Sequence, residues 1–211
     1  QKTVIVSELK KALISAQNIL FEGNNYSEDW AKEAKKRDLG NIKNTPEALE
    51  AYISNQAIST FVNNGIFTKE ELHARYEIML EDYTKKIQIE GRVLCELVYS
   101  HILPPAIGYL TTLANNVSSL KDAGLKAGAA QVELLEAISS HIDAAKQKTD
   151  EMVEARKRAN SMTSAVEQAI AYHYDVKETF DGIRYHVDKL EQVVDDKLWQ
   201  LPKYRELLFI K

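Results

Sequence analysis

The stretch between Gly128 and Gly182 contains neither glycine nor proline, and it carries one continuous helical pattern. Steps of three and four residues alternate without a break, which places side chains on one face of an α-helix. The face comprises Leu135, Ile138, Ile142, Ala145, Thr149, Met152, Arg156, Ala159, Thr163, Val166, Ile170 and His173. We expect a helix from Ala129 to about Tyr174, roughly 70 Å long at ~1.5 Å per residue. Such a helix cannot bury its apolar side alone.

A second long helix is predicted from Thr68, where Thr68 and Glu71 have the spacing of a capping box. Its apolar side is formed by Leu72, Tyr76, Met79, Tyr83, Ile87, Leu94 and Leu97. The pair Pro104-Pro105 is expected to kink or briefly interrupt it, because proline removes backbone donors and crowds the preceding turn. A turn at Asp122–Gly128 should then return the chain, so that the two long helices form an antiparallel hairpin with coiled-coil-like packing.

A third helix is expected from about Val176 to Asp195, and its border with the preceding helix is the hardest to place. Its inward side consists of Phe180, Ile183, Val187, Leu190 and Val194. An apolar tail around Pro202 follows, and we expect it to dock onto the bundle or the N-terminal helices. The tail's apolar residues are Trp199, Leu201, Tyr204, Leu207, Leu208 and Phe209.

The N-terminal third reads as short helices separated by glycine and asparagine. Helices are predicted at 7–20 with Ser7 as N-cap and at 27–37 with Ser27 as N-cap. A helix or helix pair is predicted at 45–63, with Thr45 as N-cap and Pro46 at the first helical position. The predicted fold class is therefore all-α: an elongated antiparallel bundle of two long helices, a third packed helix and short N-terminal helices. We expect residues 1–66 and 67–211 to form separate domains.

Charge and cysteine content indicate an ordinary intracellular protein. The 27 basic and 31 acidic residues leave a net charge of −4, which provides no general attraction to nucleic acid or to an anionic membrane. No stretch approaches ~20 consecutive apolar residues, so no membrane span is expected. The single cysteine, Cys95, lies in a helical apolar pattern and is expected to be packed rather than reactive. We predict a cytoplasmic location.

Motifs for catalysis or metal binding are scarce. Di-iron helical bundles use two Glu-x-x-His motifs, but only Glu70 and His73 have that spacing here. Neither a phosphate-binding glycine loop nor a Gly-x-Ser-x-Gly or His-Glu-x-x-His motif is present. We therefore assign no catalytic, cofactor-binding or metal-binding residue to this chain.

Charged residues on the long helix have a structural explanation. The basic run 156–158 could bind phosphate, but Glu151 and Glu154 lie within about one helical turn and partly neutralise it, so a solvated face is favoured. Arg156 and His173 fall on the predicted apolar face. A long arginine can extend its charge to solvent and a histidine can pair with a carboxylate, so both are expected to tune helix register or subunit contacts.

Several segments resemble the C-terminal region of type III glutamine synthetases. The matching strings are Phe21-Glu22-Gly23-Asn24-Asn25-Tyr26-Ser27-Glu28-Asp29-Trp30, His73-Ala74-Arg75-Tyr76-Glu77, Asp150-Glu151-Met152-Val153-Glu154-Ala155-Arg156-Lys157, Ile183-Arg184-Tyr185-His186, Asp188-Lys189-Leu190-Glu191, Asp195-Asp196 and Leu198-Trp199-Gln200-Leu201-Pro202-Lys203-Tyr204-Arg205-Glu206-Leu207-Leu208-Phe209. They are spread over nearly the whole chain. The ending around Trp199 and Pro202 is more specific than any helical periodicity.

The resemblance implies a parent ligase that condenses glutamate with ammonia, consuming ATP, with magnesium or manganese. Its metal-binding glutamates and phosphate-binding arginines belong to a β-rich catalytic region expected upstream of Gln1, and none maps onto this chain. Residues 1–66 would then be the tail end of the catalytic region with a linker. The family's stacked hexameric rings imply the chain's own catalytic region and neighbouring subunits as partners. The expected role is structural, in assembly or regulation, without activity of this part alone.

Two other functions remain open from the sequence. A free-standing helical interaction module would need only the long apolar face. This function and that of a ligase segment differ in what precedes Gln1. The non-methionine start favours a segment of a longer protein. A metal-dependent bundle enzyme would require bound iron, zinc or manganese. Metal analysis of the purified protein would decide that question.

Overall fold

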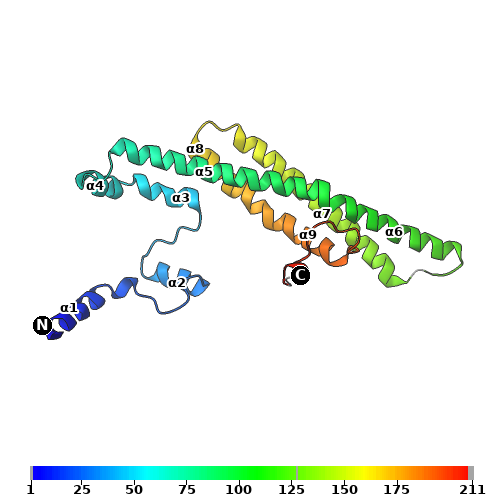
Figure 1. The fold of residues 1–211 in the computed structure, drawn as a ribbon, viewed down its shortest axis with the longest axis horizontal. Helices are drawn as coiled ribbons and strands as arrows, with labels where there is room; N and C mark the ends of the chain where they lie inside the picture. Colours follow the sequence, from blue (N-terminus) through cyan, green and yellow to red (C-terminus); the bar gives the residue numbers. More distant parts are fainter. Residues whose placement is uncertain (1, 127, 209–211) are drawn as a thin grey trace. The chain divides into compact units, whose positions relative to one another are not determined.

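A computed structural model describes residues 2–126 and 128–208. It contains two compact units, one within Gln1–Ala48 and the other within Leu49–Lys211. In the described residues every regular element is a helix and there is no strand, which confirms the predicted all-α class (Figure 1). The expected domain border between residues 66 and 67 stays a prediction.

The first helix of the smaller unit starts earlier than predicted. Helix α1 spans Lys2–Ser15 and is followed by a short 3₁₀ turn, Gln17–Ile19. Ser7 is not its N-cap, because the Ser7 hydroxyl donates to the Val4 carbonyl oxygen at 2.8 Å inside the helix. Serine can make this local bond within a helix as well as cap one, so its presence alone did not mark the start.

Helix α2, Glu28–Lys36, is capped as predicted at its start. The Ser27 hydroxyl accepts from the Trp30 amide at 3.4 Å. Its end is set by Asp38, whose φ of 56° lets the Leu39 amide reach back to the Ala34 carbonyl at 2.9 Å. Arg37, where the helix was predicted to end, is its C-cap residue.

Two short helices lead into the larger unit. Helix α3 spans Thr45–Leu49, a 3₁₀ turn follows at Glu50–Ile53, and α4 spans Asn55–Asn63. The predicted N-cap Thr45 is wrong by one residue: the Asn44 side-chain oxygen accepts from the Glu47 amide at 2.9 Å. Asparagine is at least as good an N-cap as threonine, so Pro46 is at the second helical position.

The first long helix forms as predicted, with a π-helical turn at the prolines. Helix α5 spans Lys69–Glu96, the π-helical turn η3 spans Leu97–Ile102, and α6 spans Leu103–Asp122 (Figure 1). Both hydrogen bonds of the Thr68–Glu71 capping box are present, at 3.1 and 2.8 Å. Instead of breaking the helix, Pro104 and Pro105 occupy the first turn of α6, and the π-helical turn ahead of them accommodates the missing donors.

The predicted hairpin is confirmed, but its second helix is shorter than expected. Gly124, with φ of 74°, ends α6, and α7 spans Ala129–Asn160 and packs against α6 and α5. The helix stops there and not at Tyr174, because a new helix is capped by Ser164, whose hydroxyl accepts from the Glu167 amide at 3.4 Å. Periodicity continues across this corner, so it could not reveal the break.

The third helix consequently starts at α8 and returns along α7. It consists of α8 (Ala165–Ala171), a π-helical turn η4 (Tyr172–Val176), a 3₁₀ turn η5 (Lys177–Thr179) and α9 (Phe180–Val193). Helix α9 packs mainly on α7, while α8 packs on α5. A short helix α10, Tyr204–Leu207, lies in the C-terminal segment.

The main core lies between the three long helical segments. Its fully buried members come from α6, α7, α9 and both π-helical turns: Ala106, Ile138, Ala145, Met152, Val98, Tyr172, Val176, Ile183 and Leu190. The predicted apolar face holds on α7 as far as Ala159. Beyond it Thr163 is exposed and Ile170 and His173 are half-buried, whereas Ala169 and Tyr172 are fully buried. Thr149 is also fully buried, and its hydroxyl donates to the Ala145 carbonyl at 2.7 Å.

One helix of the described residues meets the length and composition criteria for a membrane span. The continuous helix Lys69–Asp122 contains an 18-residue window with mean hydropathy 1.3, of which 28% is buried within the structure. Core helices of soluble proteins also meet these criteria. The window was not expected from the sequence, because it is not an uninterrupted run of apolar residues.

Packing around Met152 generates the first prediction. Met152 is fully buried between α7 and its neighbours, so Met152→Ala should lower the free energy of unfolding by about 2–5 kcal/mol through lost burial and the cavity left behind. Urea denaturation followed by circular dichroism measures this. The matched control is Ile89→Ala on α5, where the side chain is 60% exposed and the change should stay within about 0.5 kcal/mol. Equal effects of the two variants would contradict the described core.

Candidate functional site

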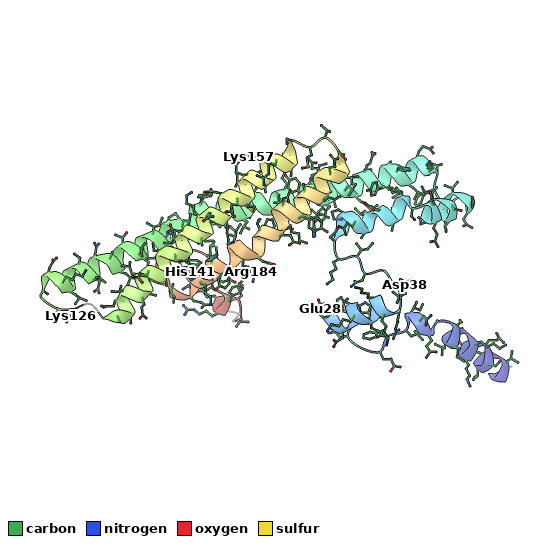
Figure 2. All side chains as sticks on the ribbon, turned by 180° about the vertical axis from the view of Figure 1, so that it is seen from behind. Glu28, Asp38, Lys126, His141, Lys157 and Arg184 are labelled. Carbon is green, nitrogen blue, oxygen red and sulfur yellow. The ribbon has the colours of Figure 1, made fainter. Side chains whose placement is uncertain are left out.

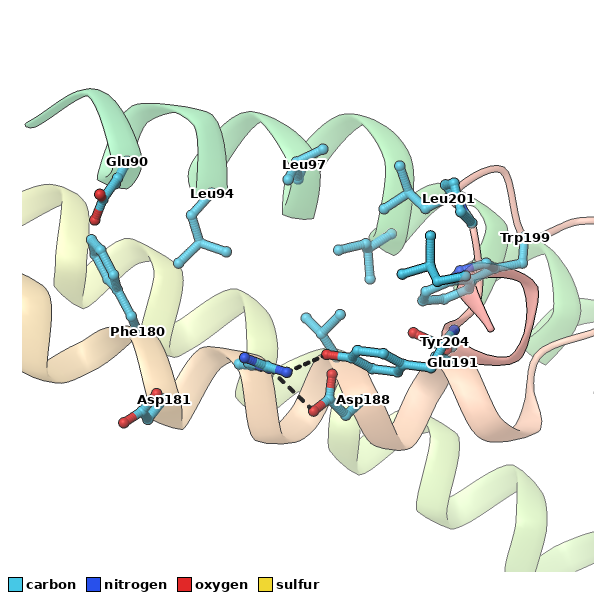
Figure 3. Close-up of a pocket in the computed structure, with 15 residues that line it drawn as sticks. Glu90, Leu94, Leu97, Phe180, Asp181, Asp188, Glu191, Trp199, Leu201 and Tyr204 are labelled. Carbon is cyan, nitrogen blue, oxygen red and sulfur yellow. Dashed lines mark hydrogen bonds and ion pairs between the residues drawn. The ribbon is translucent and has the colours of Figure 1, made fainter. Parts of the chain in front are cut away.

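A groove with mainly apolar walls lies in the larger unit. It lies between α5 with η3 on one side, α9 on the other and the C-terminal segment at one end, with a volume of about 550 Å³ (Figure 3). Its lining consists of Glu90, Leu94, Leu97, Ile102, Phe180, Asp181, Arg184, Val187, Asp188, Glu191, Trp199, Leu201, Pro202, Tyr204 and Leu207. A volume in this range is typical of small-ligand sites.

The C-terminal segment closes one end of the groove because it is tied to α9. The Lys203 ammonium donates to the Val194 carbonyl at 3.0 Å and pairs with Asp196 at 2.7 Å. The Tyr204 amide donates to the Glu191 carboxylate at 3.0 Å. Trp199 is thereby held in the core, with 7% of its surface exposed. The predicted docking of the tail onto the bundle is confirmed for Trp199 and Leu201, whereas Leu207 and Leu208 are 70% and 78% exposed and Phe209 lies outside the described residues.

The groove is rich in carboxylates. Glu90, Asp181, Asp188 and Glu191 line it, against a single cation, Arg184. Arg184 is already engaged: its guanidinium donates to the Tyr204 hydroxyl and lies 3.5 Å from the Asp188 carboxylate (Figure 3). Glu90 and Asp181 have no hydrogen bond or ion pair with any described residue. They sit near the Phe180 ring, at the end of the groove opposite Trp199 (Figure 3).

Two of the histidines meet across α7 and α9. The Nδ1 atoms of His141 and His186 are 2.9 Å apart, and Tyr185 packs edge-on against both rings. Burial lowers the pKa of His186, and His141 and Lys148 act in the same direction. A hydrogen bond between these two atoms requires that one Nδ1 carries a proton and donates it to the other. Figure 2 labels His141 on α7, close to Arg184 of α9 in that view.

His173, singled out in the sequence, has a structural environment. Its Nδ1 atom is 2.9 Å from the Tyr83 hydroxyl of α5, and its Nε2 atom is 3.8 Å from the Glu178 carboxylate. The expected pairing of this histidine with a carboxylate is confirmed. The contact joins α5 to the η4 turn, so His173 helps to align two helices.

Arg156 and Cys95 lie close to each other. Cys95 packs partly against the main core, and burial raises the pKa of its thiol more than the nearby Arg156 guanidinium lowers it. The thiol is therefore protonated at neutral pH, and the prediction of a packed cysteine is confirmed. Arg156 is half-buried, and its Nε atom is buried without a hydrogen-bond partner among the described residues.

The remaining sequence candidates do not converge on a site. Lys157, labelled near the end of α7 in Figure 2, pairs with Glu154 at 2.7 Å, which agrees with a solvated helix face. Glu70 and His73 lie in the first turns of α5. Within residues 2–126 and 128–208 no three His, Cys, Asp or Glu side chains are grouped as they would be around a metal ion.

Sequence reasoning did not identify the groove. Phe180 and Val187 were predicted to face inward, and both are half-buried at its wall. The carboxylates Asp181, Asp188 and Glu191 beside that apolar face could have indicated one wall of the groove. The other wall, on α5, lies some 90 residues earlier in the sequence, so the two could not be paired from the sequence. The groove combines an apolar floor with carboxylates at its rim, and its lining residues include no nucleophile–base pair.

Comparisons with known proteins give a consistent result. The family model described as "Glutamine synthetase C-terminal domain" matches residues 4–121. A glutamine synthetase of Bacteroides fragilis is 42% identical over 96% of the chain, and one of Butyrivibrio fibrisolvens is 32% identical over 99%. A type-3 glutamine synthetase of Dictyostelium discoideum is 29% identical over 100% of the chain.

These relatives are much longer proteins, because the chain covers 28%, 30% and 29% of their respective lengths. The matching region nevertheless extends over both structural units. The chain belongs to the glutamine synthetase C-terminal domain family.

Proposed function

We propose that this chain is the non-catalytic helical part of a glutamine synthetase, and that it holds the catalytic region and neighbouring subunits in place. The parent enzyme would make glutamine from glutamate and ammonia with ATP. The observation that carries this proposal is the match of nearly the whole chain to under a third of each longer glutamine synthetase.

The site chemistry supports a non-catalytic role. Phosphoryl transfer between ATP and a carboxylate requires metal ions held by converging carboxylates and cations that bind phosphate. No such metal-ligand group exists in the described residues, and the single groove cation, Arg184, is engaged by Tyr204 and Asp188. ATP and magnesium or manganese would therefore bind the part of the enzyme outside this chain.

Exposed apolar surface supports a role in assembly. On α1 the side chains of Val4, Ile5, Val6, Leu9, Leu13 and Ile14 are 58–64% exposed. Apolar side chains gathered on one exposed helix indicate a contact surface with another part of the protein or another subunit. The partners would be the catalytic region and copies of the same enzyme, in the cytoplasm.

The isolated chain should form no glutamine from glutamate, ammonia and ATP at any concentration of magnesium or manganese. The physical reason is that the described residues provide no ligand set for the metal ions that the reaction needs. A colorimetric or chromatographic glutamine assay measures this, with protein purified from a host that lacks its own glutamine synthetase. Turnover that persists in that preparation would contradict the proposal.

In the longer enzyme, the double variant Leu9→Asp, Leu13→Asp should weaken assembly, because two apolar side chains of α1 would be replaced by charges that resist burial. Light scattering should show a smaller mean mass, and glutamine formation should fall with it. The matched control is Lys10→Asp, Lys11→Asp on the same helix, which alters charge but keeps the apolar surface. Unchanged mass and activity in the leucine variant, or equal loss in both, would refute the role assigned to α1.

A further inference from the structure

We propose that the groove between α5, α9 and the C-terminal segment binds a small organic cation. The ligand would carry an ammonium or guanidinium group at one end, an apolar body, and a hydrogen-bond acceptor such as an amide carbonyl at the other end. This proposal does not depend on the role in assembly. Three sets of residues along the groove define the three parts of the ligand.

The cationic end is set by Glu90 and Asp181. Both carboxylates are exposed on the groove rim and have no hydrogen bond or ion pair with a described residue. The half-buried Phe180 ring lies near them, at the end of the groove away from Trp199 (Figure 3). Two free carboxylates and an aromatic ring form a combination that binds organic cations through charge-assisted hydrogen bonds and cation–π contact.

The apolar body would lie over Leu94, Leu97 and Val187. These side chains come from α5, the η3 turn and α9, and they form the middle of the groove between its two polar ends. From Asp181 to Glu191 the rise along α9 is roughly 15 Å at ~1.5 Å per residue. The volume of about 550 Å³ accommodates a slender molecule of that length.

The acceptor end is set by Trp199. Its side chain is 7% exposed and lines the groove, yet its indole Nε1 atom is buried without a hydrogen-bond partner among the described residues. An unpartnered buried donor is unfavourable, so a group that supplies an acceptor there gains a hydrogen bond that the protein alone does not make.

The remaining charges select against anions. Asp188 and Glu191 also line the groove, and the only lining cation, Arg184, is engaged by Asp188 and the Tyr204 hydroxyl. A carboxylate or phosphate ligand would meet unbalanced negative charge, whereas a cation would relieve it. The net charge of the site therefore determines which end of an amphiphilic molecule enters.

The test uses 8-aminooctanamide as the probe and the two tryptophan indole N–H signals of the ¹⁵N-labelled full chain as the readout. The probe has an ammonium, an apolar chain and an amide carbonyl. Titration should move the Trp199 indole signal saturably and leave that of Trp30 unchanged. Octanamide, which lacks the ammonium, should bind about tenfold more weakly, and octanoate should not saturate.

Variants separate the two ends of the site. The double variant Glu90→Gln, Asp181→Asn should weaken 8-aminooctanamide binding about tenfold and bring it to the level of octanamide. Trp199→Phe keeps one aromatic ring but removes the five-membered ring with its N–H, and should weaken binding about three- to tenfold. Binding to this variant is followed by the methyl signals, and circular dichroism checks the fold. The matched control is Glu133→Gln, Asp143→Asn, two exposed α7 carboxylates outside the groove, which should leave binding unchanged.

Several results would overturn the proposal. Equal affinity for 8-aminooctanamide and octanamide would show an apolar groove without charge selection. Saturable binding of octanoate, or binding that Glu90→Gln, Asp181→Asn leaves intact, would place the cation elsewhere. If only a basic amphipathic peptide shifted the Trp199 signal while the small probe did not, the groove would be a protein-docking surface.

Discussion

Burial of α7 on two sides is the constraint on which the larger unit depends. Helix α7 packs against α6 and α5 along one side and against α9 along another, and its fully buried residues include Ile138, Ala145 and Met152. A helix of this length gains its stability from tertiary packing more than from intrinsic propensity. The hairpin turn at Gly124 and the corner at Ser164 follow from the need to bring the chain back along α7 twice.

Local departures from regular helix geometry serve that packing. The π-helical turns η3 and η4 each add a wide turn to a long helix, and each contributes two buried residues to the core: Val98 and Ile102, Tyr172 and Val176. The η3 turn also places the Tyr99 hydroxyl against the Asp150 carboxylate of α7, which raises the pKa of Tyr99 to about 12. Such turns often occur where a helix must be re-aimed.

The same packing leaves a groove where α5 and α9 diverge, and the C-terminal segment closes its end through Trp199. The floor is apolar and the rim is acidic, while the polar groups that could support ligase chemistry do not converge in the described residues. The two proposals draw on different parts of the chain: the assembly role rests on exposed apolar side chains of α1, and the ligand site rests on the groove residues.

The sequence by itself determined the helical class, the capping box at Thr68, the hairpin turn and the family, because these depend on local capping, turn chemistry and residue identity along the chain. The end of α7 at Asn160 escaped it, since a corner within unbroken periodicity leaves no distinct local signal. The groove was decided only by the tertiary structure. Its walls, Leu94 on α5 and Val187 on α9, meet only after the chain has folded back twice.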